Sequence, residues 1–517
     1  MDREFWFSKK NKKFLHNIDS LYFSVFLEED FTKHETINHK GVRVHPSVRR
    51  LRTVIDRYER EVEYSSAFSE FNCDYVINFL KLGSHAHMFT FHLECPGRFD
   101  VYIAPYVPKN EKGGCVTNQI HVQIRAEYLW EVGPKLAFDY AMGYINLFCA
   151  HFKLTITNVQ ENRVDFCYHT NALTNPEKFF SSDSFPDKIV TTLGRNKEGE
   201  LRFQPMYYID QKANTKEFAY LPFGKRSDKC FLRIYHKTKE VVQQGYKGFF
   251  FYIWFFNNLI SRYDLYCFEE AYKVRSWKYV DVARLKFAKE YMKDELDPYT
   301  LSTINALLDV NDNKYDYAAI KKLADKLLPA VTRVYNIEYQ VMRRMTKTIE
   351  IRPFRDNMGV SKRMYDFLDN HELIVDYLTD KVFRIVDYDP DKDINRSRAP
   401  YCDFWRRLRG TKLVDAPSCH NLKLTRKYSS ELDLQIRKTR AVRAISSVAL
   451  AVSQDSETTI VEDAVELLSM LNDNDVRAIK NYKLNRAKQM PKREIPPPDP
   501  ERFRKFIIVD DDTGEVF

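Results

Sequence analysis

The segment GKRSDKCFLRIYHKTKE, residues 224–240, joins a polar turn to a short run in which apolar and polar residues alternate. A period of two is typical of a strand in a sheet with one covered face. The two faces are Leu232 and Ile234 on one side, and Arg233, Tyr235 and Lys237 on the other. Positive charge beside a phenol favours phenolate and attracts phosphate, which suits attack on a phosphodiester. Because the chain has 32 tyrosines, a tyrosine that only ends a strand is the commoner explanation of these residues alone.

Other strand-like runs surround this segment and predict an α+β fold built on an antiparallel or mixed sheet. They lie at residues 19–29, 87–94, 99–107, 118–132, 162–170 and 263–275. Helical candidates between them lie at 45–68 and 134–152.

From about residue 279 the apolar spacing becomes helical, as in 315–345 and 362–378, which predicts a mainly helical C-terminal region. We therefore expect an α+β domain at 1–276 and a helical extension at 277–425. Residues 426–517 follow as a helical pair with a proline-rich, acidic tail.

Composition favours a globular protein with a polyanionic partner. Lys plus Arg outnumber Asp plus Glu by 81 to 72, a formal charge of +9. The nine cysteines are scattered without a C-x-x-C pair, which argues against a disulfide framework and a zinc knuckle. The N-terminus has no signal-peptide pattern, and the longest apolar run, 248–260, is too short for a membrane helix. We expect a cytoplasmic protein without a membrane partner, in which this run is a core helix or strand.

Two acidic segments could complete a site around Tyr235. In NRVDFCYHTN, residues 162–171, Asp165 shares a strand face with Arg163, Cys167 and His169. A carboxylate there needs a partner, either a metal ion or an arginine. The second segment, FEEAYKVR at 268–275, contains Glu269 and Glu270, of which alternation aims only one at a given face.

The order of these motifs resembles that of the rolling-circle replication initiation factors, a family of plasmid and filamentous-phage initiators and related conjugative relaxases. The strand with Asp165 comes first, the Arg-x-Tyr-x-Lys segment second and the strand with the glutamates third. Residues 395–410, NRSRAPYCDFWRRLRG, are similar to the N-x-x-R and W-x-x-L run of the family.

The resemblance implies a tyrosine nucleophile that nicks origin DNA, forms a 5′-phosphotyrosine bond and frees a 3′-OH for synthesis. Tyr235 would be that nucleophile, with Arg233 and Lys237 as phosphate clamps. Carboxylates would bind Mg²⁺ or Mn²⁺: Asp165 and either Glu269 or Glu270, with His169 where the family often has a second Asp. Glu338, in the segment 334–344, competes for the role of the acidic ligand.

DNA contacts are expected from basic and aromatic residues. The candidates are Arg163, Lys225, Arg226, Trp405, Arg406, Arg407 and Arg409, with the segments 42–52 and 436–443. The family role also implies a host helicase and polymerase as partners, and makes a homodimer plausible.

Several alternatives stay open at this point. A conjugative relaxase would use the same chemistry, and a degenerate initiator would bind the origin without cutting it. His85 and His87, with His92 nearby, could instead form the metal site of an HUH endonuclease. A structural or adaptor protein of a mobile element is the remaining class.

Overall fold

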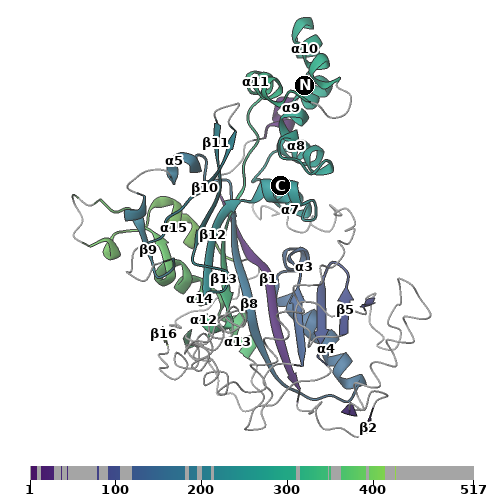
Figure 1. Cartoon of the computed structure of the whole chain (residues 1–517), viewed down its shortest axis with the longest axis vertical. Coiled ribbons are helices and arrows are strands. Elements are labelled where there is room, and N and C mark those ends of the chain that lie inside the picture. Colours follow the sequence, from purple (N-terminus) through teal and green to yellow (C-terminus); the bar gives the residue numbers. More distant parts are fainter. Residues whose placement is uncertain are drawn as a thin grey trace, which may run out of the picture.

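A ten-stranded sheet forms the centre of the computed structural model (Figure 1), and all its neighbouring strands run antiparallel. Its order is β10 (Met206–Asp210), β11 (Thr215–Phe223), β12 (Cys230–His236), β13 (Tyr335–Met342), β8 (Ile156–Thr170), β1 (Phe14–Leu27), β7 (Ile120–Ile124), β6 (Phe99–Ile103), β5 (Phe91–Cys95) and β4 (Asn78–Leu80). The predicted α+β class with an antiparallel sheet is confirmed.

The structure describes residues 2–8, 13–27, 36–37, 43–44, 78–80, 91–104, 119–180, 185–194, 201–210, 215–309, 315–346, 349–350, 363–389, 391, 395–413 and 425–426. The predicted helix at 45–68 and almost all of the predicted region 426–517 lie outside these residues.

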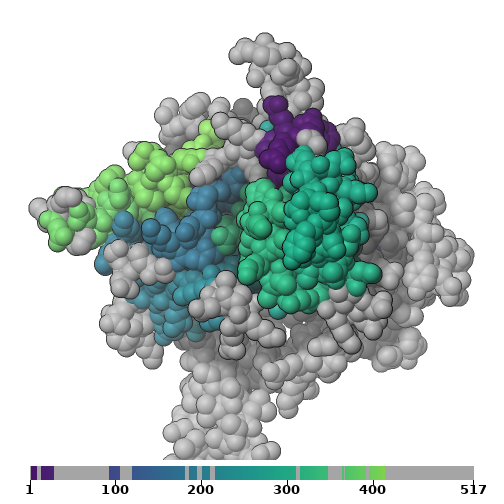
Figure 2. Space-filling model, turned by 90° about the horizontal axis from the view of Figure 1, so that it is seen from above, coloured from purple at the N-terminus to yellow at the C-terminus, as the bar shows by residue number. Residues whose placement is uncertain are grey.

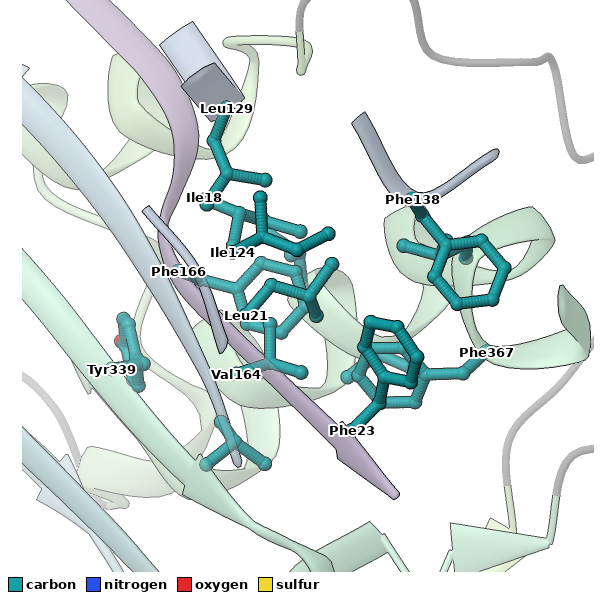
Figure 3. Close-up of a cluster of buried hydrophobic side chains, with 14 of the residues drawn as sticks. Ile18, Leu21, Phe23, Ile124, Leu129, Phe138, Val164, Phe166, Tyr339 and Phe367 are labelled. Atoms are coloured by element: carbon teal, nitrogen blue, oxygen red, sulfur yellow. The ribbon is translucent and has the colours of Figure 1, made fainter. Parts of the chain in front are cut away.

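One face of the sheet is apolar and packs against helices. Figure 3 shows Ile18, Leu21 and Phe23 of β1 beside Val164 and Phe166 of β8, with Phe138 and Phe367 to their right. The covering helices include α4 (Pro134–His151), α13 (Arg363–Asp369), α14 (His371–Tyr377) and α15 (Asp403–Arg409). Burial of this face supplies the main hydrophobic stabilisation of the sheet.

The opposite face meets a helical lobe, residues 237–327, which is inserted in the chain between β12 and β13 (Figure 1). The lobe consists of α6 (Lys237–Gln244), α7 (Phe249–Phe256), α8 (Arg262–Lys273), α9 (Tyr279–Tyr291), α10 (Pro298–Leu308) and α11 (Tyr317–Leu327). Its core is a second hydrophobic cluster, which also includes Trp130 and Cys167. The N-terminal helix α1 (Arg3–Trp6) lies against the lobe (Figure 2), where Trp6 meets Phe287 at a ring distance of 4.9 Å.

The apolar run at 248–260 forms the buried helix α7, which confirms its prediction as core. Among the described helices, none combines the length and the apolar character that a bilayer crossing requires.

Three segments differ from their predicted structure. Residues 118–132 begin as β7 and continue as helix α3 (Ala126–Val132), and residues 263–275 form helix α8 instead of a strand. In 315–345, α11 is followed by strand β13, because the apolar positions of 335–342 have a period of two and both neighbouring strands lie within pairing distance. β13 lies between β12 and β8, so the sheet extends past the predicted domain boundary at residue 276.

Smaller elements complete the described fold: β2 (Thr36–Ile37), β3 (Arg43–Val44), α5 (Pro176–Phe179), β9 (Ile189–Thr191), α12 (Arg343–Thr346), β14 (Ile349–Glu350), β15 (Phe383–Ile385) and β16 (Thr425–Arg426).

Candidate active site

A row of polar side chains crosses the sheet face that is opposite to the main core. It arises because every second residue of a strand points to the same face. Its members are Arg233 and Tyr235 on β12, Asn336, Glu338 and Gln340 on β13, and Arg163, Asp165, Cys167 and His169 on β8. The pairing sets Arg233 opposite Glu338, and Tyr235 opposite Asn336.

The hydroxyl of Tyr235 is the most densely bonded group of the row. It donates to Oε2 of Glu338 at 2.9 Å and accepts from Nδ2 of Asn336 at 3.0 Å and from Nζ of Lys237 at 3.2 Å. Burial, with the charges of Glu240 and Glu338, raises the pKa of Tyr235 well above its usual range. The phenol is therefore protonated at rest, and its proton already points at a carboxylate.

Arg233 connects the phenol and the same carboxylate. Its Nε donates to Oε1 of Glu338 at 2.9 Å, and its guanidinium lies 5.0 Å from the ring centre of Tyr235. Of the three residues, Arg233 has the most exposed side chain, at 19%. The role of a phosphate clamp predicted for Arg233 stays a prediction.

Lys237 is the first residue of α6, and its side chain is fully buried. Besides Tyr235, its ammonium contacts Oδ2 of Asp19 at 3.3 Å and Oε2 of Glu240 at 2.9 Å. Burial lowers the pKa of Lys237, but the charges of Asp19 and Glu240 outweigh burial and raise it, so the ammonium is charged. The role of a phosphate clamp predicted for Lys237 stays a prediction; its contacts are all with groups of the protein interior.

Asp165 is paired with Arg163 on its own strand. Nε of Arg163 donates to Oδ1 at 2.8 Å, and the second guanidinium nitrogen donates to Oδ2. Burial and the charge of Glu338 together raise the pKa of Asp165 to about 6, against the effect of Arg163. The two carboxylates therefore repel each other, which is the electrostatic condition that a bound cation relieves.

His169 is enclosed by aromatic rings. Trp254 donates to its Nδ1 at 3.1 Å, Trp130 stacks on it at 5.0 Å, and burial lowers its pKa to about 3. Asp19, Cys167 and His169 offer potential metal-ligand atoms within 4.8 Å of one another.

All three potential ligands are, however, already bonded to protein groups. Asp19 bonds to Lys237 and Trp130, Cys167 donates to the carbonyl of Asn17 at 3.2 Å, and His169 accepts from Trp254. The arrangement is a hydrogen-bonded core cluster, and we assign no metal to it.

Glu269 and Glu270 lie on helix α8, where a strand was predicted. Glu269 accepts a hydrogen bond from Tyr252 at 2.7 Å, and Glu270 pairs with Lys273 and Lys286. Both acids are thus engaged within the helical lobe. The acid that the fold brings to Tyr235 is Glu338, the competing candidate.

Lys225 and Arg226 form the turn between β11 and β12. Gly224 enters this turn with φ of 86°, a conformation that favours glycine. The amide of Lys225 donates to Oδ2 of Asp228 at 2.8 Å, and the carbonyl of Arg226 accepts from Gln340 at 3.1 Å. The hydrogen bond from Gln340 therefore fixes this turn beside the polar row.

Trp405 was predicted to stack on DNA bases, and this prediction is wrong. The side chain is fully buried in the main core, and its Nε1 donates to the carbonyl of Thr379 at 2.8 Å. The neighbouring arginines differ in how accessible they are. The side chain of Arg406 is 67% exposed, whereas Arg409 contacts Asp376, Asp380 and Tyr401. Arg407 lies on the same helix, α15.

The histidines of the alternative HUH site are only partly described. His85 and His87 lie outside the described residues. His92 is on β5, where its Nε2 contacts Oδ1 of Asp100 at 2.8 Å.

Sequence reasoning missed two members of the site, Asp19 and Asn336. Asp19 carries a detectable signal, because a carboxylate interrupts the apolar run IDSLYFSVF and a buried carboxylate requires a partner. Asn336 has no such signal.

Comparison with known proteins adds a distant structural likeness. No family model matches the chain, and no curated protein matches it significantly. Among solved structures, the chain is similar to a rolling circle replication initiator protein from Geobacillus stearothermophilus, with 12% identity and a TM-score of 0.33. The match covers 77% of this chain and 96% of that one. At that degree of likeness, function has to be argued from the residues of this chain.

Proposed function

We propose that this chain is a metal-dependent, site-specific DNA endonuclease and strand transferase that starts rolling-circle replication of a plasmid or phage. One observation carries the proposal. The phenol of Tyr235 donates to Glu338 at 2.9 Å and accepts from the ammonium of Lys237 at 3.2 Å, and the Arg233 guanidinium lies over its ring. A nucleophile, a proton acceptor and one cation thus meet at one oxygen, with a second cation over the ring, and phosphoryl transfer requires groups of these kinds.

The reaction follows from these contacts. The phenol proton passes to Oε2 of Glu338, and the freed electron pair of Tyr235 forms a bond to phosphorus. The bond between phosphorus and the 3′ oxygen breaks, and that oxygen takes a proton from water to become the 3′-OH, while Glu338 returns its proton to the solvent. The 5′ phosphate stays on Tyr235, and reversal of the same steps joins strands.

In this proposal, Asp165 and Glu338 would hold a divalent ion in exchange for their present partners, Arg163 and Arg233. The two acids lie on neighbouring strands and share the polar face. Burial and repulsion by Glu338 raise the pKa of Asp165 to about 6. Carboxylate oxygens suit Mg²⁺ or Mn²⁺. When bound, such an ion would polarise the scissile phosphate.

The partner is DNA in this proposal, and positive charge supports it. The formal charge is +9, and Arg406 is 67% exposed. Arg163, Arg233 and the turn with Lys225 and Arg226 are assigned to phosphate contacts near the cut. A host helicase and polymerase, a homodimer and a cytoplasmic location belong to the same proposal.

Two other functions remain as competing candidates. A conjugative relaxase would use the same residues and differ only in its DNA. A non-catalytic origin-binding protein is favoured by one observation: Tyr235 is only 7% exposed, so a phosphate reaches its hydroxyl only if neighbouring groups move.

The test compares the native chain with Tyr235→Phe and Tyr220→Phe on supercoiled DNA of its own genetic element, with Mg²⁺ or Mn²⁺. Tyr220 is the matched control because it lies directly opposite Tyr235 on β11. We expect the native protein and Tyr220→Phe to nick and to stay attached to the 5′ end, and Tyr235→Phe to bind without nicking.

The other results reject the proposal in different ways. Nicking by Tyr235→Phe would show that another residue is the nucleophile. Binding by all three proteins without any nicking would establish the origin-binding function instead. Nicking at a transfer origin in place of a replication origin would identify a relaxase.

A further inference from the structure

Asp19 lies at an irregularity of β1 that turns its side chain out of the regular pleat. The pairing with β8 shifts between Ile18, opposite Phe166, and Ser20, opposite Asp165, so Asp19 has no partner residue in the ladder. Such bulges re-aim a side chain. Asp19 is 3% exposed, and a buried carboxylate is stable only with its own hydrogen-bond partners.

Each oxygen of Asp19 has one partner. Trp130 on α3 donates its indole N–H to Oδ1 at 2.9 Å, and Lys237 donates to Oδ2 at 3.3 Å. The indole contact fixes the orientation of the carboxylate. The second oxygen then determines where the ammonium of Lys237 is held.

The ammonium of Lys237 donates hydrogen bonds to Asp19 and to the Tyr235 hydroxyl at 3.2 Å, and forms an ion pair with Glu240 at 2.9 Å. The ring of Phe250 covers it at 4.8 Å. Glu240 lies one turn along α6, so its contact forms within the helix itself. Asp19 belongs to a different element, β1, 218 residues away in the chain, and its contact ties the Lys237 side chain to that strand.

We propose that Asp19 is a positioning residue, which holds the Lys237 ammonium against the Tyr235 oxygen so that Lys237 stabilises the negative charge of that oxygen during attack on phosphorus. This inference rests on the proposed function. The proton of Tyr235 still goes to Glu338, and Lys237 keeps its own protons throughout. A fixed charge in a dry site is effective because nothing has to reorient when the charge develops.

The experiment measures single-turnover nicking rate and DNA affinity separately, on supercoiled DNA of the chain's own element. Asp19→Asn keeps the shape and removes the charge, and Asp19→Glu restores the charge. Lys237→Met removes the ammonium itself. The matched control is Asp264→Asn, a fully buried carboxylate that caps α8 through Ser261 and contacts Thr332.

We expect Asp19→Asn to slow nicking roughly tenfold to a hundredfold and Lys237→Met by roughly a hundredfold or more, the range found when a preorganised charge-stabilising group is lost. DNA affinity should stay within about twofold, Asp19→Glu should recover part of the rate, and Asp264→Asn should nick at the native rate. An unchanged rate in Asp19→Asn would overturn the inference. So would an equal loss in Asp264→Asn, or a parallel loss of affinity, because a general structural defect produces both.

Failure of the proposed function is recognised separately, since the native protein would then not nick at all. If thermal melting shows that Asp19→Asn is unfolded, Trp130→Phe replaces it. This variant removes the indole hydrogen bond to Asp19 and keeps an aromatic ring where Trp130 stacks on His169. We expect a severalfold slower rate at native affinity; a native rate would overturn the inference.

Discussion

The hydroxyl of Tyr235 and the carboxylate of Glu338 are 2.9 Å apart, although 103 positions separate the two residues in the chain. The whole helical lobe lies between them in sequence, and the pairing of β12 with β13 brings them together. The contact is diagonal across the ladder, because Tyr235 is opposite Asn336 and Glu338 is opposite Arg233. One carboxylate therefore serves both the nucleophile and its neighbouring arginine.

Replacement of Glu338 should strongly slow nicking. We expect Glu338→Gln to lower the single-turnover rate by roughly a hundredfold or more, since the amide cannot take the phenol proton and general-base catalysis contributes about that much. The measurement is nicking of supercoiled DNA with Mg²⁺. The matched control is Glu269→Gln, whose glutamate contacts Tyr252 in the helical lobe, and it should retain native activity. The reverse pattern would restore Glu269 as the functional acid.

The pair of Arg233 and Glu338 should show strong thermodynamic coupling. Glu338 has a side-chain exposure of 2%, so Arg233→Met leaves a buried carboxylate without its main cation. We expect a loss of about 3 kcal/mol in the free energy of unfolding. The double variant Arg233→Met with Glu338→Met should lose less than the sum of the two single variants, measured by urea unfolding. Additive losses would mean that the pair does not interact in solution.

Residues of α15 should separate into stabilising and DNA-binding classes. Trp405→Ala should cost about 3–5 kcal/mol of stability, because it removes a fully buried indole. Its folded fraction should bind DNA with native affinity. Arg406→Ala should leave stability unchanged and lower the slope of log affinity against log salt concentration by about one. An unchanged salt slope would exclude Arg406 from the DNA interface.

Stability should fall in mild acid through buried histidines. Burial lowers the pKa of His169 and of His16 to about 3, from 6.5 in the unfolded chain. The folded chain binds a proton on each imidazole less tightly than the unfolded chain does. The stability that depends on neutral histidines is therefore complete above pH 6.5 and decreases as the pH falls towards 3. Each histidine contributes a slope of about 1.4 kcal/mol per pH unit within that window.

The check is urea unfolding of the native chain, His169→Gln and His16→Gln between pH 7 and pH 4. Each variant should lower the change in the free energy of unfolding per pH unit by about 1.4 kcal/mol, the amount that one titrating histidine contributes. A slope that both variants leave unchanged would show that these side chains are charged or solvated in the folded state.

Local patterns in the sequence were enough to predict which site residues share a strand face. Alternation in residues 230–237 placed Arg233 and Tyr235 on one face, because strand geometry allows no other arrangement. The same reasoning placed Asp165 beside Arg163 on β8, and predicted an antiparallel or mixed sheet with helices around it.

The distant residues that complete the site are brought together by strand pairing and packing, and local patterns did not predict them. The segment with Glu338 follows a long helical pattern and the segment with Glu269 resembles a strand, so local patterns favoured Glu269 over the acid that contacts Tyr235. Pairing with β12 and β8 makes 335–342 a strand, since its backbone groups find partners on both sides. Likewise, an irregularity in β1 aims Asp19 at Lys237, and burial turns Trp405 from a DNA contact into core. Such outcomes depend on which surfaces meet after folding, which no local periodicity encodes.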